Sequence, residues 1–332
     1  MLIDFHVHLA GSGCCHSGII LGKIFEKRPS FFFLKKSQKI TNEQMNSDID
    51  LIWIKRISNL IEESKQINKA VTLCLDAIYD ESGKLIPEFI QMYIPNSWGD
   101  YAVKQFPNTL LHGASIHPYR KDAIQELEIC AKNNAFLIKW LPSMMGIDPE
   151  NKLCFPFYEA LKHYKIPLLS HTDNEYTFAE PKKGWLKNNH ILKLKKALDL
   201  GVVVIAAHAG TPSQMHEAEE LASQYENFFL DTSGLFNPTR ARSSLKLFEK
   251  SQASLLGDRL LFATDWPVPS FPLFLIDKIG LSSYKEISAI KNPFLKDLRI
   301  KEKLGFHIQR FKKNQETLLT LLGRSHTEIN LT

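Results

Sequence analysis

The first eight residues combine a short apolar run with two histidines that stand one residue apart, His6 and His8. Side chains at positions i and i+2 of a β-strand project from the same face, so a strand here would present both imidazoles together, with Asp4 below them. Neutral imidazole is the commonest metal ligand in proteins, and two on one strand need only a few further N or O donors to complete a zinc-like shell. The pair therefore predicts half of a metal site.

Further candidate donors follow apolar runs later in the chain. Lys139 lies in the run 136–141, His171 ends the run 167–171, His208 follows Val202-Val-Val-Ile-Ala-Ala207, and Asp265 stands in Ala263-Thr-Asp-Trp-Pro267. Each of these polar groups would lose much of its hydration free energy if it were buried alone. A shared divalent cation would offset that loss for all of them.

The elements that must position these residues are eight apolar runs separated by helical patterns. The runs are rich in Val, Ile, Leu and Phe, which is typical of parallel strands buried on both faces. Eight strand and helix units that close on themselves form a (β/α)₈ TIM barrel, whose chemistry lies at the carboxyl ends of the strands. A doubly wound sheet is the alternative fold, but no glycine-rich phosphate turn follows the first run. The predicted strand ends lie near His8, Leu75, Ile116, Leu141, His171, His208, Thr232 and Asp265.

One segment interrupts this alternation after the first strand. Residues 12–46 are too many for a simple connection and too apolar to be disordered, so we expect a helical insertion above one rim of the barrel, able to act as a lid. At least two of its three consecutive phenylalanines, 31–33, are expected to pack the insertion onto the barrel. Two C-terminal helices between Lys285 and Leu322 would complete the outer layer. We expect residues 1–332 to form one domain.

Composition narrows the class of protein. The chain of 332 residues is 44% hydrophobic with a formal charge of +5, and its basic residues are scattered, so neither nucleic-acid binding nor membrane binding is expected. We expect no disulfide framework from the five cysteines, no membrane span and no cleaved signal segment. These features predict a cytoplasmic enzyme acting on a small molecule, and a homo-oligomer is compatible with them.

The polar residues together resemble the amidohydrolase superfamily. The order His-x-His, Lys, His, His, Asp on strands one, four, five, six and eight carries the resemblance. The segments Asp4-Phe-His-Val-His-Leu9 and Ala263-Thr-Asp-Trp-Pro267 look like its amidohydrolase-related branch, which also includes metal-dependent decarboxylases. The likeness extends to Gly113-Ala-Ser-Ile-His-Pro118 and to the Asn292-Pro-Phe stretch, and the insertion is outside it.

The resemblance implies a set of site residues. It implies that His6, His8, His171 and Asp265 are metal ligands, and that His208 is a ligand of a second metal or a catalytic histidine. Lys139 matches the lysine that, in binuclear members, is carboxylated by CO₂ and bridges two metals, because a carbamate is an anionic oxygen donor. The expected cofactor is a divalent metal, with zinc favoured, and one or two ions per chain both fit.

Such a site favours hydrolysis of a C–N or C–O bond in an amide, lactone or ester. A divalent ion lowers the pKa of bound water to about 7 and polarises a carbonyl oxygen. Asp265 would accept the water proton, and His208 would serve as a base or polarise the substrate. The alternatives are a single-metal decarboxylase or hydratase of the same superfamily, a TatD-type nuclease, and a non-catalytic metal-binding barrel. The nuclease lacks support, because Lys139 stands where that family has an acidic residue.

Residues near the strand ends are candidates for the substrate pocket. Asp173 and Glu175, in His171-Thr-Asp-Asn-Glu175, are candidate acceptors for the ligand imidazoles, or else solvated loop carboxylates. Arg240 could bind a substrate anion, whereas core packing is the simpler role for each tryptophan. The candidate substrate-binding residues are Trp140, Tyr176, Arg240 and Trp266.

Overall fold

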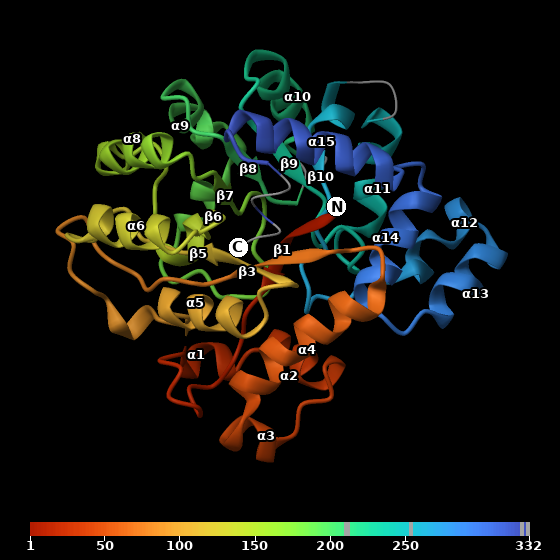
Figure 1. Cartoon of the computed structure of the whole chain (residues 1–332), viewed down its shortest axis with the longest axis horizontal. Coiled ribbons are helices and arrows are strands. Elements are labelled where there is room, and N and C mark those ends of the chain that lie inside the picture. The colour runs from red at the N-terminus through yellow and green to blue at the C-terminus, as the bar shows by residue number, and fades with distance from the viewer. Residues whose placement is uncertain (209–212, 252–254, 326–328, 330–332) are drawn as a thin grey trace.

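The computed structural model describes residues 1–208, 213–251, 255–325 and 329. Within these residues, eight parallel strands form one sheet whose spatial order follows the chain (Figure 1). A second, two-stranded sheet pairs β2 (Ile20–Leu21) with β4 (Met92–Tyr93). The eight strands are β1 (Ile3–His8), β3 (Lys69–Leu73), β5 (Leu110–Ala114), β6 (Leu137–Trp140), β7 (Leu168–Ser170), β8 (Val204–Ala206), β9 (Phe228–Asp231) and β10 (Leu260–Leu261).

The first and last strands close the barrel. The backbone N–H of Phe5 donates to the carbonyl of Phe262 at 3.0 Å, the N–H of Asp265 donates to His6 at 2.9 Å, and the N–H of His8 donates to Trp266 at 2.8 Å. The predicted TIM barrel is confirmed. The closing hydrogen bonds place the ends of β1 and β10 side by side.

Helices surround the barrel on its outside (Figure 1). In α4, Trp53, Ile57 and Ile61 are buried at the i, i+4 and i+8 spacing of a helix that packs one face on a sheet. Between β7 and β8 the chain forms two consecutive 3₁₀ turns, Trp185–Asn189 and Ile191–Leu194, followed by a short α-helix. The helices that follow the strands up to β10 are α4 (Ile49–Ser64), α5 (Asn96–Gln105), α6 (Ala123–Lys132), α7 (Pro142–Met145), α8 (Phe155–Tyr164), α9 (Lys195–Asp199), α10 (Met215–Gln224) and α11 (Ala241–Ser251).

The C-terminal segment adds α12 (Ile276–Ile279), α13 (Leu281–Ala289), α14 (Pro293–Lys303) and α15 (Ile308–Leu321). The two helices expected between residues 285 and 322 are α14 and α15, and a further helix, α13, ends at Ala289 before Asn292 caps α14. The side-chain oxygen of Asn292 accepts the N–H groups of Phe294 and Leu295, and the proline at 293 fits only the first turn. Leu318 and Leu319 of α15 pack on the barrel's interior apolar cluster.

The insertion after β1 is helical, as predicted. It contains β2, α1 (Lys23–Glu26), α2 (Pro29–Ser37) and α3 (Asn42–Ser47), which lie together next to α4 at the bottom of the view in Figure 1. The expected packing of its phenylalanines was wrong for two of them. Phe32 and Phe33 are 61% and 50% exposed, and only Phe31 faces inward, against Phe25 at 5.5 Å between ring centroids.

A β-bulge in β1 determines which of its side chains face the barrel interior. The pairing with β3 shifts register between Asp4 and Val7. Ile3 and Phe5 belong to the interior cluster, whereas Val7 belongs to the cluster that packs against the outer helices. A bulge re-aims the side chains that follow it, so His6 and His8 also reach the interior at the end of the strand. None of the described helices has the length and apolarity needed to cross a bilayer.

Candidate functional site

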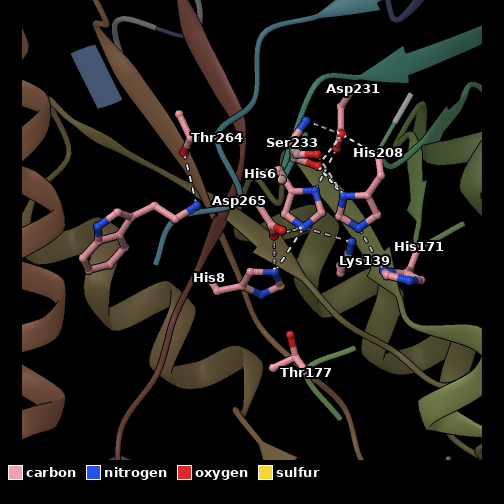
Figure 2. A network of polar contacts seen from close by, with 12 residues as sticks. His6, His8, Lys139, His171, Thr177, His208, Asp231, Ser233, Thr264 and Asp265 are labelled. Atoms are coloured by element: carbon pink, nitrogen blue, oxygen red, sulfur yellow. Dashed lines mark hydrogen bonds and ion pairs between the residues drawn. The ribbon is translucent and has the colours of Figure 1, made fainter. Parts of the chain in front are cut away.

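Three side chains from the two closing strands converge at the carboxyl end of the barrel. Nε2 of His6 lies 3.1 Å from Nε2 of His8 and 3.4 Å from Oδ1 of Asp265, and the same Oδ1 lies 3.1 Å from Nε2 of His8 (Figure 2). His6 is buried, and Asp265 is almost fully buried. Asp265 lies in the loop after β10, and its backbone N–H donates to the carbonyl of His6.

Asp4 does not lie below the histidines as the simple strand alternation predicts. Its carboxylate accepts the N–H of His6 at 3.1 Å, the N–H of Thr264 at 3.1 Å and the hydroxyl of Thr264 at 2.7 Å. Burial raises the pKa of Asp4 to about 7, although these hydrogen bonds oppose the rise. Asp4 thus joins the backbone of both segments that carry the three converging side chains.

The imidazole of His6 is held from both of its nitrogens. Nδ1 lies 2.7 Å from Oδ2 of the buried Asp231, and Nε2 lies 3.2 Å from the ammonium nitrogen of Lys139. Burial, together with the nearby Lys139, lowers the pKa of His6 to about 4, so the ring is neutral at pH 7. A neutral ring with its proton on Nδ1, facing the carboxylate, directs the Nε2 lone pair towards His8 and Asp265.

Two further histidines continue this network. Nδ1 of His171 lies 3.0 Å from Nε2 of His208, and Nδ1 of His208 lies 3.1 Å from the carbonyl oxygen of Ser233. Burial and neighbouring cations lower the pKa of both rings well below the usual range, so both are neutral. Lys139, whose pKa burial lowers to about 8, lies between this pair and the first three residues. All six residues assigned as ligands from the sequence therefore meet in one continuous network, in which His6, His8 and Asp265 lie closest together.

Glu175 and Arg240 occupy the rim beside the histidine pair. Oε2 of Glu175 lies 3.5 Å from Nε2 of His171, while Oε1 accepts the N–H groups of Thr177 and Phe178. Burial raises the pKa of Glu175. Nη2 of Arg240 donates to the carbonyl of Asn174 at 2.8 Å, but its buried Nε has no hydrogen-bond acceptor among the described residues. Oδ2 of Asp173 lies 3.8 Å from this Nε. Of the two candidate carboxylates, Asp173 therefore faces Arg240, and Glu175 approaches a site imidazole.

A cavity opens from the histidines towards the insertion. Its volume is about 150 Å³, and Tyr176 and Arg240 are among its lining residues. The guanidinium of Arg240 lies 5.5 Å from the centre of the Tyr176 ring. The two tryptophans proposed with them lie outside this cavity. Trp140 is buried against Phe157 and donates to the carbonyl of Ile116, and Trp266 packs between Trp53 and Phe294, so we remove both from the substrate-binding set.

A glycine leaves space beside the second oxygen of Asp265. Gly234 has a φ of +60°, and a Cβ built on it would lie 2.5 Å from Oδ2 of Asp265 and 3.4 Å from Nη1 of Arg240. Burial raises the pKa of Asp265, but the hydrogen bond from His8 and the charges nearby outweigh it and hold the pKa below its usual value. The carboxylate is therefore ionised, with one oxygen towards the histidines and the other close to Gly234.

The three converging atoms fit a divalent cation. Ligand atoms at about 2.0–2.2 Å from a tetrahedral zinc ion are separated from each other by about 3.3 Å, close to the three distances between His6, His8 and Asp265. The donor set is two imidazoles and one ionised carboxylate, which are ligands that zinc and similar ions accept. A carboxylate behind a ligand imidazole, as Asp231 is behind His6, is a recurrent feature of metal sites.

Sequence reasoning missed Asp231 and Ser233. Oδ1 of Asp231 accepts the backbone N–H of His208 at 2.9 Å and that of Ser233 at 3.0 Å. Both residues directly follow the apolar run 228–230, in Asp231-Thr-Ser233, so they occupy the position that was searched for ligands on other strands. That placement was a usable signal, but only the structure shows that the aspartate turns to His6.

Two comparisons by sequence bear on the family of the chain. A family model described as amidohydrolase matches residues 90–281, which is more than half of the chain. A search of curated proteins by sequence finds no match.

Solved structures share the fold at low sequence identity. An uncharacterized TIM-barrel protein from Bordetella bronchiseptica is 17% identical with a TM-score of 0.62, covering 97% of this chain and 99% of that one. A probable 2-pyrone-4,6-dicarboxylic acid hydrolase from Acinetobacter baumannii is 11% identical with a TM-score of 0.58 and the same coverage. A 2,6-dihydroxybenzoate decarboxylase from Rhizobium is 14% identical with a TM-score of 0.51, covering 94% and 99%. From its match to the family model, the chain belongs to the amidohydrolase family.

Proposed function

We propose that this protein is a metal-dependent hydrolase that cleaves a C–N or C–O bond in an amide, lactone or ester of a small molecule. The observation that carries the proposal is the convergence of His6 Nε2, His8 Nε2 and Asp265 Oδ1 within 3.4 Å of each other. These residues would hold the ion, and zinc is the ion we favour. A divalent cation, when bound, supplies the Lewis acidity that polarises a carbonyl oxygen and makes water more acidic.

Asp265 and His208 are the residues that we assign to proton transfer and to metal binding. Asp265 is ionised and lines the cavity, so it is the group placed to accept a proton from the attacking water and return it to the leaving group. His208 is neutral and lines the cavity, and because its Nδ1 proton faces the carbonyl of Ser233, its Nε2 is the nitrogen that would serve as a ligand or a base. Asp231 and Ser233 orient it through its backbone N–H and its Nδ1.

Arg240 favours a second candidate, a metal-dependent decarboxylase. Its guanidinium lines the cavity, is 5% exposed and keeps a buried Nε without an acceptor among the described residues. A buried cation with an unused donor is suited to a carboxylate, because hydrogen bonds to a charged group are the strong ones. A decarboxylase needs such a group, whereas a hydrolase of neutral substrates does not.

One experiment distinguishes the hydrolase from the decarboxylase. The purified protein is loaded with Zn²⁺, and amides, lactones, esters and aromatic acids are assayed side by side. Hydrolysis releases one equivalent of acid per bond without CO₂, and decarboxylation releases CO₂. We expect acid release from the hydrolytic panel. Asp265→Asn should lower the rate by at least about 100-fold, the usual contribution of a positioned acid or base. His163→Ala is the control, because His163 is an exposed residue of α8.

A further inference from the structure

The insertion forms a fixed wall over the cavity. Its β2 pairs with β4 on one side. On a second side, Ser30 Oγ and Arg28 Nε donate to the carbonyl of Thr177, at 2.6 Å and 2.9 Å. On a third side, Nε2 of Gln38 donates to the carbonyl of Pro267 at 3.2 Å, in the loop that follows Asp265. Three attachments to separate loops position the insertion above the strand ends that carry the site.

Helix α2 in this wall has a cavity face and a solvent face. Phe31, Leu34 and Lys35 line the cavity at the i, i+3 and i+4 spacing of one helix face. Phe32 and Phe33 lie on the solvent face, where Phe32 is 61% exposed and Phe33 is 50% exposed. The ammonium group of Lys35 donates to Oδ1 of Asn42 within the insertion, so the face that α2 turns to the cavity is mainly apolar.

The cavity is divided by polarity. Apart from Lys35, the charged residues that line the cavity come from the strand ends and the loops after them. Examples are Lys139, Glu175, Arg240 and Asp265. The insertion supplies apolar side chains to the other part, and the barrel rim adds more. The apolar residues from the insertion are Leu21, Phe25, Phe31, Leu34, Ile40 and Met45.

We propose that the substrate carries an uncharged apolar group next to its scissile bond, and that the insertion binds this group. The inference rests on the proposed function only in placing the reacting carbonyl at His6, His8 and Asp265. A charged or strongly polar group in the apolar part would lose its hydration without gaining a partner. The whole cavity, about 150 Å³, is roughly the size that holds one benzene ring, so the apolar part accommodates a group no larger than that. The substrate class is a compact aryl or short alkyl amide, lactone or ester.

A binding series tests the proposal without relying on turnover. Linear alkyl hydroxamates from acetohydroxamate to decanohydroxamate share one metal-chelating head and differ only in apolar length. Their dissociation constants are measured by calorimetry on the zinc-loaded protein. We expect affinity to rise by up to about fourfold for each added methylene until the cavity is filled at roughly six carbons, and then to level off.

Matched variants of α2 assign the effect to the insertion. Leu34→Gln should flatten the series, and Leu34→Trp should shift its plateau to shorter chains, because it fills cavity volume. Phe33→Gln is the control on the same helix and should leave the series unchanged, since its side chain is on the solvent face. A flat series in the unmodified protein, absence of hydroxamate binding, or equal effects of Leu34→Gln and Phe33→Gln would overturn the proposal. A rising series without hydrolysis of any ester, lactone or amide would instead reject the proposed reaction and retain the apolar subsite.

Discussion

Oδ2 of Asp231 accepts a hydrogen bond from Nδ1 of His6 at 2.7 Å, and both side chains are buried. The other oxygen of the same carboxylate accepts the backbone N–H of His208 at 2.9 Å. Desolvation opposes ionisation of Asp231, but His6, Lys139 and Ser233 outweigh it and hold its pKa well below the usual range. The ionised carboxylate of Asp231 thus sets the tautomer of His6 in β1 and positions His208 after β8.

Replacing this carboxylate should weaken metal binding while the barrel remains folded. In Asp231→Asn, the neutral amide no longer favours the His6 tautomer with its proton on Nδ1. We expect the dissociation constant for Zn²⁺ to rise about 10- to 100-fold, as is typical when the partner of a ligand imidazole is lost. Competition with a chromophoric chelator measures this constant directly.

Asp76→Asn is the matched control for that variant. Asp76 is also a buried carboxylate after a strand, and it accepts the N–H of His117 at 2.7 Å and a guanidinium hydrogen of Arg120 at 3.1 Å. It does not line the cavity. We expect a lower unfolding temperature with unchanged zinc affinity. If both variants lost zinc affinity equally, the role assigned to Asp231 would be wrong.

Gly234→Ala should damage the site more than the fold. The new Cβ would meet Oδ2 of Asp265 at 2.5 Å, in a residue with a φ of +60°. Gly184→Ala separates the two effects, because Gly184 has a φ of +94° and no atom within 4 Å of its built Cβ. Both variants should lose about 1–2 kcal/mol of stability from the left-handed backbone. Only Gly234→Ala should also lower zinc affinity and turnover, by about tenfold or more, and equal activity in both would contradict the role given to Asp265.

The barrel and the approximate position of the site could be predicted because buried parallel strands leave a plain signal in the sequence. Runs such as 202–207 are apolar throughout, and in a barrel every such run ends at the same rim. Polar residues placed directly after several runs must therefore lie near one another. This is why His171, His208 and Asp265 could be assigned to one region before their distances were known.

The same signal does not show which face of a strand a side chain occupies. Both faces of a barrel strand are buried, so no alternation of polar and apolar residues separates interior from exterior. Trp140 is therefore as compatible with the outer core as with the cavity, and the structure places it in the core. In β1 the bulge between Asp4 and Val7 changes the alternation itself, which is why Asp4 lies with Thr264 and not beneath the histidines.

The number of bound metal ions tests the role of Lys139. The three ligand atoms that converge belong to His6, His8 and Asp265, whereas Lys139 approaches only His6, at 3.2 Å. We expect elemental analysis to give about one ion per chain and Lys139→Met to retain it, with turnover reduced. About two ions per chain in the presence of bicarbonate, falling in the variant, would instead establish a carboxylated Lys139 that bridges two metals.

His117 should make the protein less stable in mild acid. Nε2–H of His117 donates to the carbonyl of Met145 at 2.9 Å, and Nδ1 accepts the N–H of Tyr119 at 3.1 Å, so the buried neutral ring has both nitrogens bonded. Burial, opposed by the hydrogen bond to Met145, lowers its pKa from 6.5 to about 3. Protonation of the folded form would place a hydrogen against the N–H of Tyr119.

The sign of the pH effect follows from which state binds the proton. Above about pH 6.5 the imidazole is neutral in both states, so its contribution to the free energy of unfolding is complete and constant. Below that pH the unfolded chain gains a proton that the folded chain does not, and stability falls by up to about 1.4 kcal/mol per pH unit until about pH 3. His117→Asn keeps an acceptor for Tyr119 and cannot titrate. Urea unfolding of both proteins between pH 7 and pH 5 should show the unmodified protein more stable at pH 7 and the gap narrowing in acid. A gap that stays constant would mean that the buried ring is not the source of the acid sensitivity.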